Sequence, residues 1–343
     1  MTLEIARVDA LEDVGADWGP LAEAAGNVFG TPEWLTAWQR HFGADQELRI
    51  YTVREGGRLA AVLPLVLWRS ARPRVLRFAG HGPSDAMGPV CAPADRALAA
   101  SALEQVLGEG GWDVLLAERL PTRELLGGLP ARELQSEPSP VLSIEGQSWD
   151  DYLASKSSNF RQQARRRERK LAKEHELSFR LADDPERLDA DLEALFRLHD
   201  ERWSEEGSGA LQDDRRTAFH RDFARSALER GWLRLWLLEL DGAVAAAWYG
   251  LRFAQRELYY QAGRDPELER LAVGFVLLVH SVREAFEDGM LEYDFLRGGE
   301  GYKDRFTDDA TAVTTWAAGR GPLGRATVAV APRLRSVLAS RLR

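Results

Sequence analysis

Alternating apolar positions recur in two stretches of the chain, and each stretch predicts a β-hairpin. Residues 48–68 have the pattern of a strand, a glycine turn and a second strand, and residues 233–253 repeat it around an Asp-Gly turn. An irregular segment, an apolar helix and a short strand follow each hairpin. A repeat roughly 180 residues long is the size of a domain. The pattern therefore predicts two tandem copies of one unit, with the functional site in the groove between them.

Helical periodicities fill most of the remaining chain. Together with the hairpins they predict a mixed α/β fold class. We expect an N-terminal unit over residues 1–145, a C-terminal unit with the active site over 146–320, and a basic C-terminal tail over 321–343. The expected helices cover residues 32–41, 95–107, 150–154, 160–174, 186–205 and 216–230.

Composition narrows the class of protein. The net charge of −9 argues against general nucleic-acid coating, so we expect no DNA partner. Cys91 is the single cysteine, which excludes an internal disulfide and a thiolate zinc site. The early acidic residues and the lack of a long apolar run at the N-terminus favour a cytoplasmic protein without a signal peptide. No metal-binding spacing is present.

Several local strings resemble the GNAT acyltransferases, in particular the CelD-like acetyltransferases linked with polysaccharide gene clusters. Those proteins are similar in turn to the Fem-type aminoacyltransferases, which also carry two tandem GNAT-like units. The resemblance covers about residues 25–318, and 294–306 is its most specific part. The strings are Gly30-Thr-Pro-Glu-Trp34, the arginine-rich 157–173, Leu198-His-Asp-Glu-Arg-Trp203, Gly263-Arg-Asp-Pro266 and Asp294-Phe-Leu-Arg-Gly-Gly-Glu-Gly-Tyr-Lys-Asp-Arg-Phe306.

The resemblance implies transfer of an acyl group, with acetyl expected, from acyl-CoA to an amine or hydroxyl of a sugar- or peptide-like acceptor. A first alternative is a Fem-like enzyme that takes its group from aminoacyl-tRNA. A second alternative is a non-catalytic GNAT-like protein that binds a ligand or partner. No metal is implied in any of the three.

The resemblance also implies roles for two neighbouring residues. Tyr302 corresponds to the tyrosine that protonates the departing thiolate in GNAT enzymes. Lys303 corresponds to a lysine at the transfer site of Fem-type relatives, where it could stabilise the oxyanion. We also expect Tyr302 to open a helix after the last strand.

Acyl transfer further needs a base for the acceptor proton. Asp294 and Glu300 flank one predicted strand end, and either carboxylate could act as the base if burial raises its pKa. Asp294 could equally pair with Lys303 or Arg297. His199, with Arg202 near it, is a secondary catalytic candidate, although a lone histidine on an apolar helix face is more often a core residue.

Donor binding depends on the segment before the second apolar helix. GNAT enzymes that use acyl-CoA hold its pyrophosphate with a glycine-rich loop and a helix N-terminus. Here that segment contains Arg270 and Gly274 with altered spacing. The basic helix of residues 160–173 suggests a second anion contact, and Arg161 and Arg165 share one of its faces. CoA phosphates, a sugar diphosphate and the tRNA backbone all fit this charge. The basic tail could dock on the protein or contact a membrane surface.

Overall fold

The computed structural model describes residues 3–68, 72–203 and 213–330. They form two compact units, one of residues 3–138 and 312–330 and the other of residues 139–311. Each unit contains a twisted mixed sheet with helices, which confirms the predicted α/β class.

The first unit has a sheet in the order β1-β2-β3-β4-β6-β13, and β5 pairs with β3. Helix α2 begins where expected, because the Thr31 side chain accepts a hydrogen bond from the Trp34 amide and Pro32 occupies the first helical position. The strands are β1 (Leu3–Val8), β2 (Gln46–Glu55), β3 (Arg58–Trp68), β4 (Val75–Phe78), β5 (Val90–Cys91), β6 (Val114–Leu120) and β13 (Ala310–Gly319), and the helices are α1 (Trp18–Ala24), α2 (Pro32–Phe42), α3 (Arg96–Gly108) and α9 (Gly321–Val330).

The second unit has a sheet in the order β7-β12-β11-β10-β9-β8. Its basic helix begins after Ser157, whose side chain accepts a hydrogen bond from the Phe160 amide. The strands are β7 (Arg132–Ser143), β8 (Leu177–Leu181), β9 (Leu233–Leu240), β10 (Ala243–Phe253), β11 (Arg256–Arg264) and β12 (Glu292–Asp294), and the helices are α4 (Trp149–Ser155), α5 (Ser158–Glu174), α6 (Leu188–Trp203), α7 (Asp214–Glu229) and α8 (Val273–Glu287).

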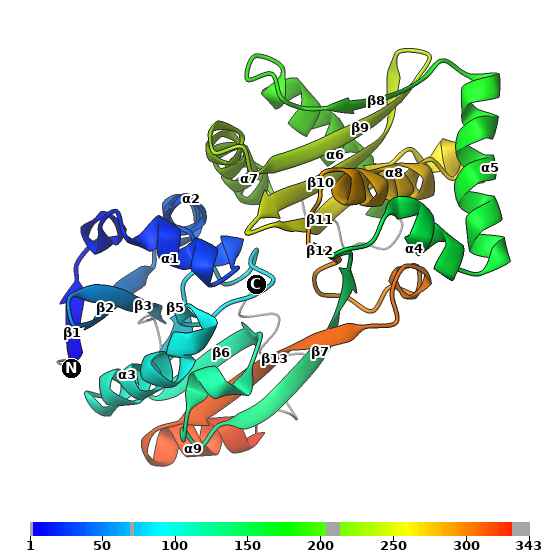
Figure 1. Ribbon diagram of the computed structural model, residues 1–343. Coiled ribbons are helices and arrows are strands. Elements are labelled where there is room, and N and C mark those ends of the chain that lie inside the picture. The colour runs from blue at the N-terminus through cyan, green and yellow to red at the C-terminus, as the bar shows by residue number, and fades with distance from the viewer. Residues whose placement is uncertain (1–2, 69–71, 204–212, 331–343) are drawn as a thin grey trace. The chain divides into compact units, whose positions relative to one another are not determined.

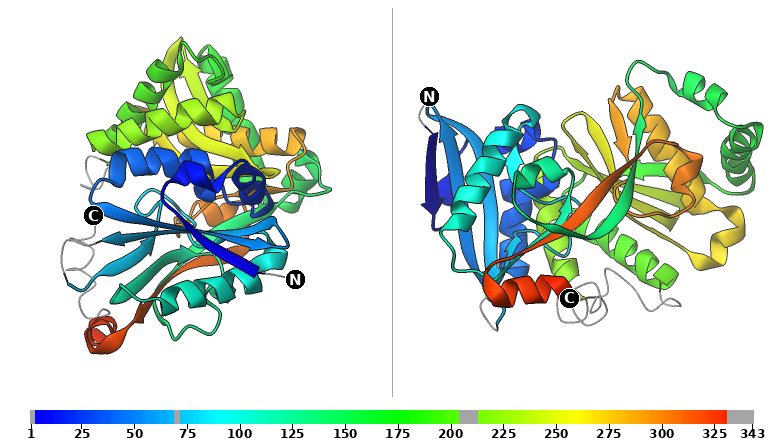
Figure 2. Two further views of the ribbon diagram at one scale, coloured as in Figure 1. Left: turned by 90° about the vertical axis from the view of Figure 1, so that its left-hand side faces the viewer. Right: turned by 90° about the horizontal axis from the view of Figure 1, so that it is seen from below.

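The two sheets repeat one topology. The hairpin β2–β3, blue in Figures 1 and 2, corresponds to β9–β10, coloured yellow. In each unit a parallel pair follows, β4 with β6 and β11 with β12. The last strand of each repeat joins the sheet of the other repeat. Strand β13, which ends the second repeat, pairs with β6 of the first, and residues 141–143 of β7, which ends the first repeat, pair with β12 of the second. The exchange explains why the unit boundaries fall within β7 and β13.

Two local expectations need correction. Asp95 precedes α3 but does not cap it, because its carboxylate accepts hydrogen bonds of 2.8 and 2.9 Å from Arg58. Tyr302 is followed by a single 3-10 turn, Lys303–Arg305, rather than by a helix, and β13 comes after it. Residues 331–343 of the basic tail lie outside the described residues.

Helices cover both faces of the second sheet. The side chains of β9 alternate between the two faces of the sheet. Trp236, Leu238 and Leu240 belong to the core cluster that also contains residues of α4, α5 and α8. Leu235 and Leu237 are equally buried and point to the other face, where α6 packs against β10 and β11 and α7 packs against β9. No helix in the described parts of the chain combines the length and apolar character needed to cross a bilayer.

Candidate functional site

The chain turns sharply at the end of β12. Asp294 is buried, and its Oδ1 accepts a hydrogen bond of 2.8 Å from the Leu296 amide. Its other oxygen lies 2.7 Å from Arg256 Nη2, on the neighbouring strand β11. Asp294 therefore helps to hold the strand end, and it forms an ion pair with Arg256.

Lys303 points back into the loop that follows β12. Only 3% of the residue is exposed, and its ammonium donates to the carbonyl oxygens of Leu296, Arg297 and Gly298 at 3.0–3.4 Å. Glu300 Oε2 lies 2.8 Å from Nζ. Because a buried ammonium must be compensated, this shell explains how Lys303 can be buried while charged.

The glycines of this loop permit the arrangement. Gly298 has φ +124°, in the region that favours glycine, and a Cβ there would overlap the Glu300 carboxylate. Glu300 can therefore fold back onto Lys303. The string Arg-Gly-Gly-Glu-Gly-Tyr-Lys is thus a loop that brings a carboxylate to a buried lysine.

Tyr302 lies beside Tyr259 of β11, with ring centroids 6.3 Å apart. The charge of Arg202, in the last turn of α6, acts on both phenol groups. Burial raises the pKa of Tyr302, and the neighbouring Tyr259 and the charge of Glu300 raise it further. Tyr302 is therefore protonated at neutral pH, as a proton donor must be.

His199 is buried in the same turn of α6 that carries Arg202. Burial lowers its pKa, and Gln261 on β11 is close enough to affect it. The helix comes this close to the strand because residue 263 is glycine: a Cβ there would lie 2.5 Å from the His199 backbone nitrogen. Two of the strings that suggested the family resemblance thus meet in space.

The N-terminus of α8 is open. Ala272 precedes it in a left-handed conformation, φ 56° and ψ 40°, and no side chain caps the first turn. Gly274 lies in this turn, where a Cβ would be 3.2 Å from Cδ of Arg264. Arg270 is exposed in the preceding 3-10 turn. The arrangement leaves amide groups and a positive helix end for an anion.

Two more cations converge on this helix end. The guanidinium carbons of Arg305 and Arg167 lie 4.7 and 5.5 Å from the ring centroid of Phe275, in the first turn of α8. Burial lowers the pKa of Arg305, and the charge of Arg167 lowers it further. Among the described residues, neither guanidinium forms an ion pair with a carboxylate, and Arg305 donates to the Gln163 amide oxygen at 2.9 Å.

The structure places Arg161 and Arg165 against another element. The Arg161 guanidinium donates to the carbonyl oxygens of Ala154 and Lys156, at the end of α4, at 2.8 and 2.6 Å. Arg165 is exposed, and its nearest carboxylate is Asp150 at 4.0 Å. Both therefore contact α4 and the connection that follows it.

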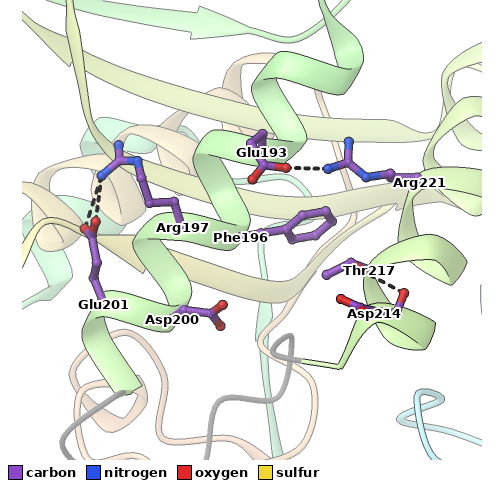
Figure 3. A pocket seen from close by; sticks show the side chains of 8 residues that line it. All are labelled: Glu193, Phe196, Arg197, Asp200, Glu201, Asp214, Thr217 and Arg221. Atoms are coloured by element: carbon purple, nitrogen blue, oxygen red, sulfur yellow. Dashed lines mark hydrogen bonds and ion pairs between the residues drawn. The ribbon is translucent and has the colours of Figure 1, made fainter.

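A separate cavity of about 530 Å³ lies between α6 and α7 (Figure 3). Arg221 pairs there with Glu193, and Arg197 pairs with Glu201 at 3.0 Å. None of the sequence-predicted site residues lines it. The cavity lining is Glu193, Phe196, Arg197, Asp200, Glu201, Asp214, Thr217 and Arg221.

Sequence reasoning missed Tyr259 and did not single out Arg305 or Arg167. Tyr259 lies within an ordinary apolar strand pattern, and only the pairing of β11 with β12 brings it beside Tyr302. Arg305 lies two residues after Lys303 in the string of residues 294–306, and this closeness in sequence to a candidate catalytic residue could have identified it. Arg167 was one of many arginines on α5, and its position over Phe275 alone distinguishes it.

Comparison with known proteins identifies the domain in which most of these residues lie. The acetyltransferase (GNAT) domain family matches residues 158–304, from α5 to the turn that contains Lys303. No curated protein matches the chain significantly. The more specific CelD-like resemblance has no counterpart in these matches.

Several solved structures share the fold. FemX has a TM-score of 0.67 and 11% identity, covering 95% of this chain and 100% of its own. A second structure is the C-terminal domain of a protein assigned as a lysylphosphatidylglycerol synthetase from Agrobacterium fabrum. It has a TM-score of 0.60 and 14% identity, and the match covers 95% of this chain and 96% of that domain. L-PGS from Bacillus licheniformis has a TM-score of 0.56 and 12% identity, and the match covers 88% of this chain and 96% of that structure. Residues 158–304 thus match the acetyltransferase (GNAT) domain family, and the chain shares its fold with these structures along most of its length.

Proposed function

We propose that the protein transfers an acyl group, with acetyl the expected group, from acyl-CoA to an amine or hydroxyl of a sugar- or peptide-like acceptor. The observation that carries this proposal is the open N-terminus of α8, with Arg305 and Arg167 facing Phe275 in its first turn. A pyrophosphate fits such a site, because amide groups and guanidinium groups both donate to its oxygens. Arg270 and Gly274 border the same site.

The residues around Tyr302 supply the chemistry. Tyr302 protonates the departing thiolate, since it is held neutral beside Tyr259. Of the two candidate bases, Glu300 is the one whose charge acts on Tyr302, although each is ion-paired, Glu300 with Lys303 and Asp294 with Arg256. Lys303 orders the loop and places positive charge beside the reacting carbonyl.

The donor can be identified by ligand-induced stabilisation. CoA at about 100 times its Kd adds about 2.7 kcal/mol to the free energy of unfolding by mass action. We therefore expect CoA to raise Tm by several degrees. Arg305→Gln and Arg167→Gln should each weaken CoA binding about 10-fold or more, whereas Arg169→Gln, on the exposed face of α5, should not.

The observation that favours a second candidate is the exposed basic face of α5. Arg165, Arg166 and Arg169 are exposed there, followed by Lys170 and Lys173. Such a surface fits the phosphate backbone of an aminoacyl-tRNA donor. If tRNA raises Tm and CoA does not, and Arg169→Gln weakens tRNA binding as much as Arg305→Gln does, the donor is aminoacyl-tRNA and the first candidate is wrong.

A further inference from the structure

Uncharged side chains hold the guanidinium group of Arg305. Its central carbon lies 4.7 Å from the ring centroid of Phe275 and 5.5 Å from that of Phe160. Its Nη2 donates a hydrogen bond of 2.9 Å to Oε1 of Gln163, on α5. Aromatic rings and an amide oxygen can fix the direction of a guanidinium, but they leave its charge in place. Arg305 is therefore oriented without being neutralised.

The orientation of the Gln163 amide follows from its two partners. A guanidinium cannot accept a hydrogen bond, so the amide oxygen of Gln163 must face Arg305. The Nε2 of Gln163 then donates to Oδ1 of Asn159, one turn earlier on α5, at 2.9 Å. Both ends of the amide are used, and its oxygen is held toward Arg305.

A second guanidinium beside the same ring also keeps its charge. The guanidinium carbon of Arg167 lies 5.5 Å from the ring centroid of Phe275, and the next residue along the chain is acidic. That residue, Glu168, pairs instead with Arg283 of α8 at 3.3 Å. Two like charges beside one ring repel each other, and an anion bound between them removes the repulsion. The local contacts therefore keep Arg167 and Arg305 available for an anion.

We propose that Gln163 is a positioning residue for Arg305, whose guanidinium it directs to the phosphate groups of the acyl donor while leaving the charge intact. The inference rests on the proposed function, because that function places the donor phosphates at the N-terminus of α8. A carboxylate in place of the amide would hold Arg305 equally well, but it would neutralise the guanidinium and compete with the phosphates for it. An amide orients the cation without this competition.

The binding of CoA and, separately, of inorganic pyrophosphate tests the inference by titration calorimetry on the full chain. Gln163→Glu should weaken both about 10-fold, because its carboxylate occupies Arg305. Gln162→Glu is the matched control, since it makes the same change of charge at the neighbouring residue of α5, which is exposed. Salt screens an exposed charge, so the control should weaken binding less than about twofold.

Thermal unfolding separates positioning from a purely structural role. Gln163→Glu should keep or raise Tm, because it replaces a neutral hydrogen bond to Arg305 with an ion pair. Stability and donor affinity should therefore change in different directions. If Gln163→Glu lowers Tm by several degrees, Gln163 serves the packing of the domain and the inference is wrong.

A neutral variant and a double variant test the same point independently. Gln163→Leu leaves Arg305 charged but without its hydrogen bond, so affinity should fall only about threefold. A loss as large as that of Gln163→Glu would show that the retained charge is not what the amide provides. In the Arg305→Gln background, Gln163→Glu should cost little more, because it acts through Arg305; a second loss of about 10-fold would contradict this.

Failure of the inference and failure of the proposed function give different results. If the unmodified protein binds CoA and Gln163→Glu binds it equally well, or if Gln162→Glu weakens it as much, the inference is wrong and the proposed donor stands. If the unmodified protein binds pyrophosphate but not CoA, and Gln163→Glu weakens that binding, the inference holds and acyl-CoA is not the donor. If it binds neither, both are wrong.

Discussion

Gly263 of β11 lies directly against the backbone of His199 in α6, so close that a Cβ on the glycine would be 2.5 Å from the His199 nitrogen. Helix α6 therefore rests on the strand without an intervening side chain. This contact sets the distance from α6 to β11, and with it the positions of His199 and Arg202 near the transfer residues.

Gly263→Ala should push α6 away from β11. Overpacking of this kind costs about 1–3 kcal/mol, so we expect Tm to fall by several degrees. Activity should fall as well, because His199 and Arg202 move away from β11 with the helix. Gly19→Ala in α1 is a suitable control, since nothing lies within 4 Å of a Cβ there. Equal Tm values for the two variants would contradict the proposed contact.

Lys303→Ala should lower turnover about 100-fold or more, because it removes the charge that holds Glu300 and the loop around Tyr302 in place. It should also destabilise the loop after β12 by about 1–3 kcal/mol, because three carbonyls lose a charged donor. Steady-state kinetics and thermal unfolding separate the two effects. Near-normal turnover in the folded variant would remove Lys303 from the mechanism.

The two carboxylates should respond differently to neutralisation. Glu300→Gln should lower kcat about 100-fold and lower Tm as well, because Glu300 acts on Tyr302 and is the carboxylate that pairs with buried Lys303. Asp294→Asn should mainly lower Tm, since it removes one of the two carboxylates that pair with Arg256 at the strand end. The reverse pattern would assign the base to Asp294.

Acid should destabilise the protein through buried histidines. Burial lowers the pKa of His220 to about 3, with the charge of Arg216 contributing. Because this folded-state pKa lies below the unfolded value of about 6.5, the stabilisation is complete above pH 6.5 and is lost as pH falls toward 3. His280, also lowered to about 3, adds to the effect.

The measurement is the free energy of unfolding by urea between pH 6 and pH 4. His220→Gln should reduce the slope by about 1.4 kcal/mol per pH unit, because one proton fewer is taken up on unfolding. An unchanged slope would show that His220 does not remain neutral in the folded protein.

The sequence by itself determined the class and the elements of this protein. Period-two alternation predicted both hairpins, and capping residues placed the starts of α2 and α5, because these signals depend only on neighbouring residues. The repeat implied two similar units, and the string around Tyr302 and Lys303 carried a resemblance whose GNAT part, though not its CelD-like part, the domain match supports.

Only the tertiary structure decided which residues meet. Parallel pairing of β11 with β12 brings Tyr259 to Tyr302, and the exchange of β7 and β13 completes each sheet with the last strand of the other repeat. Phe275 gathers Arg167 and Arg305 from elements more than 100 residues apart. Such contacts arise from register and packing between distant segments, and no local pattern of residue types specifies them.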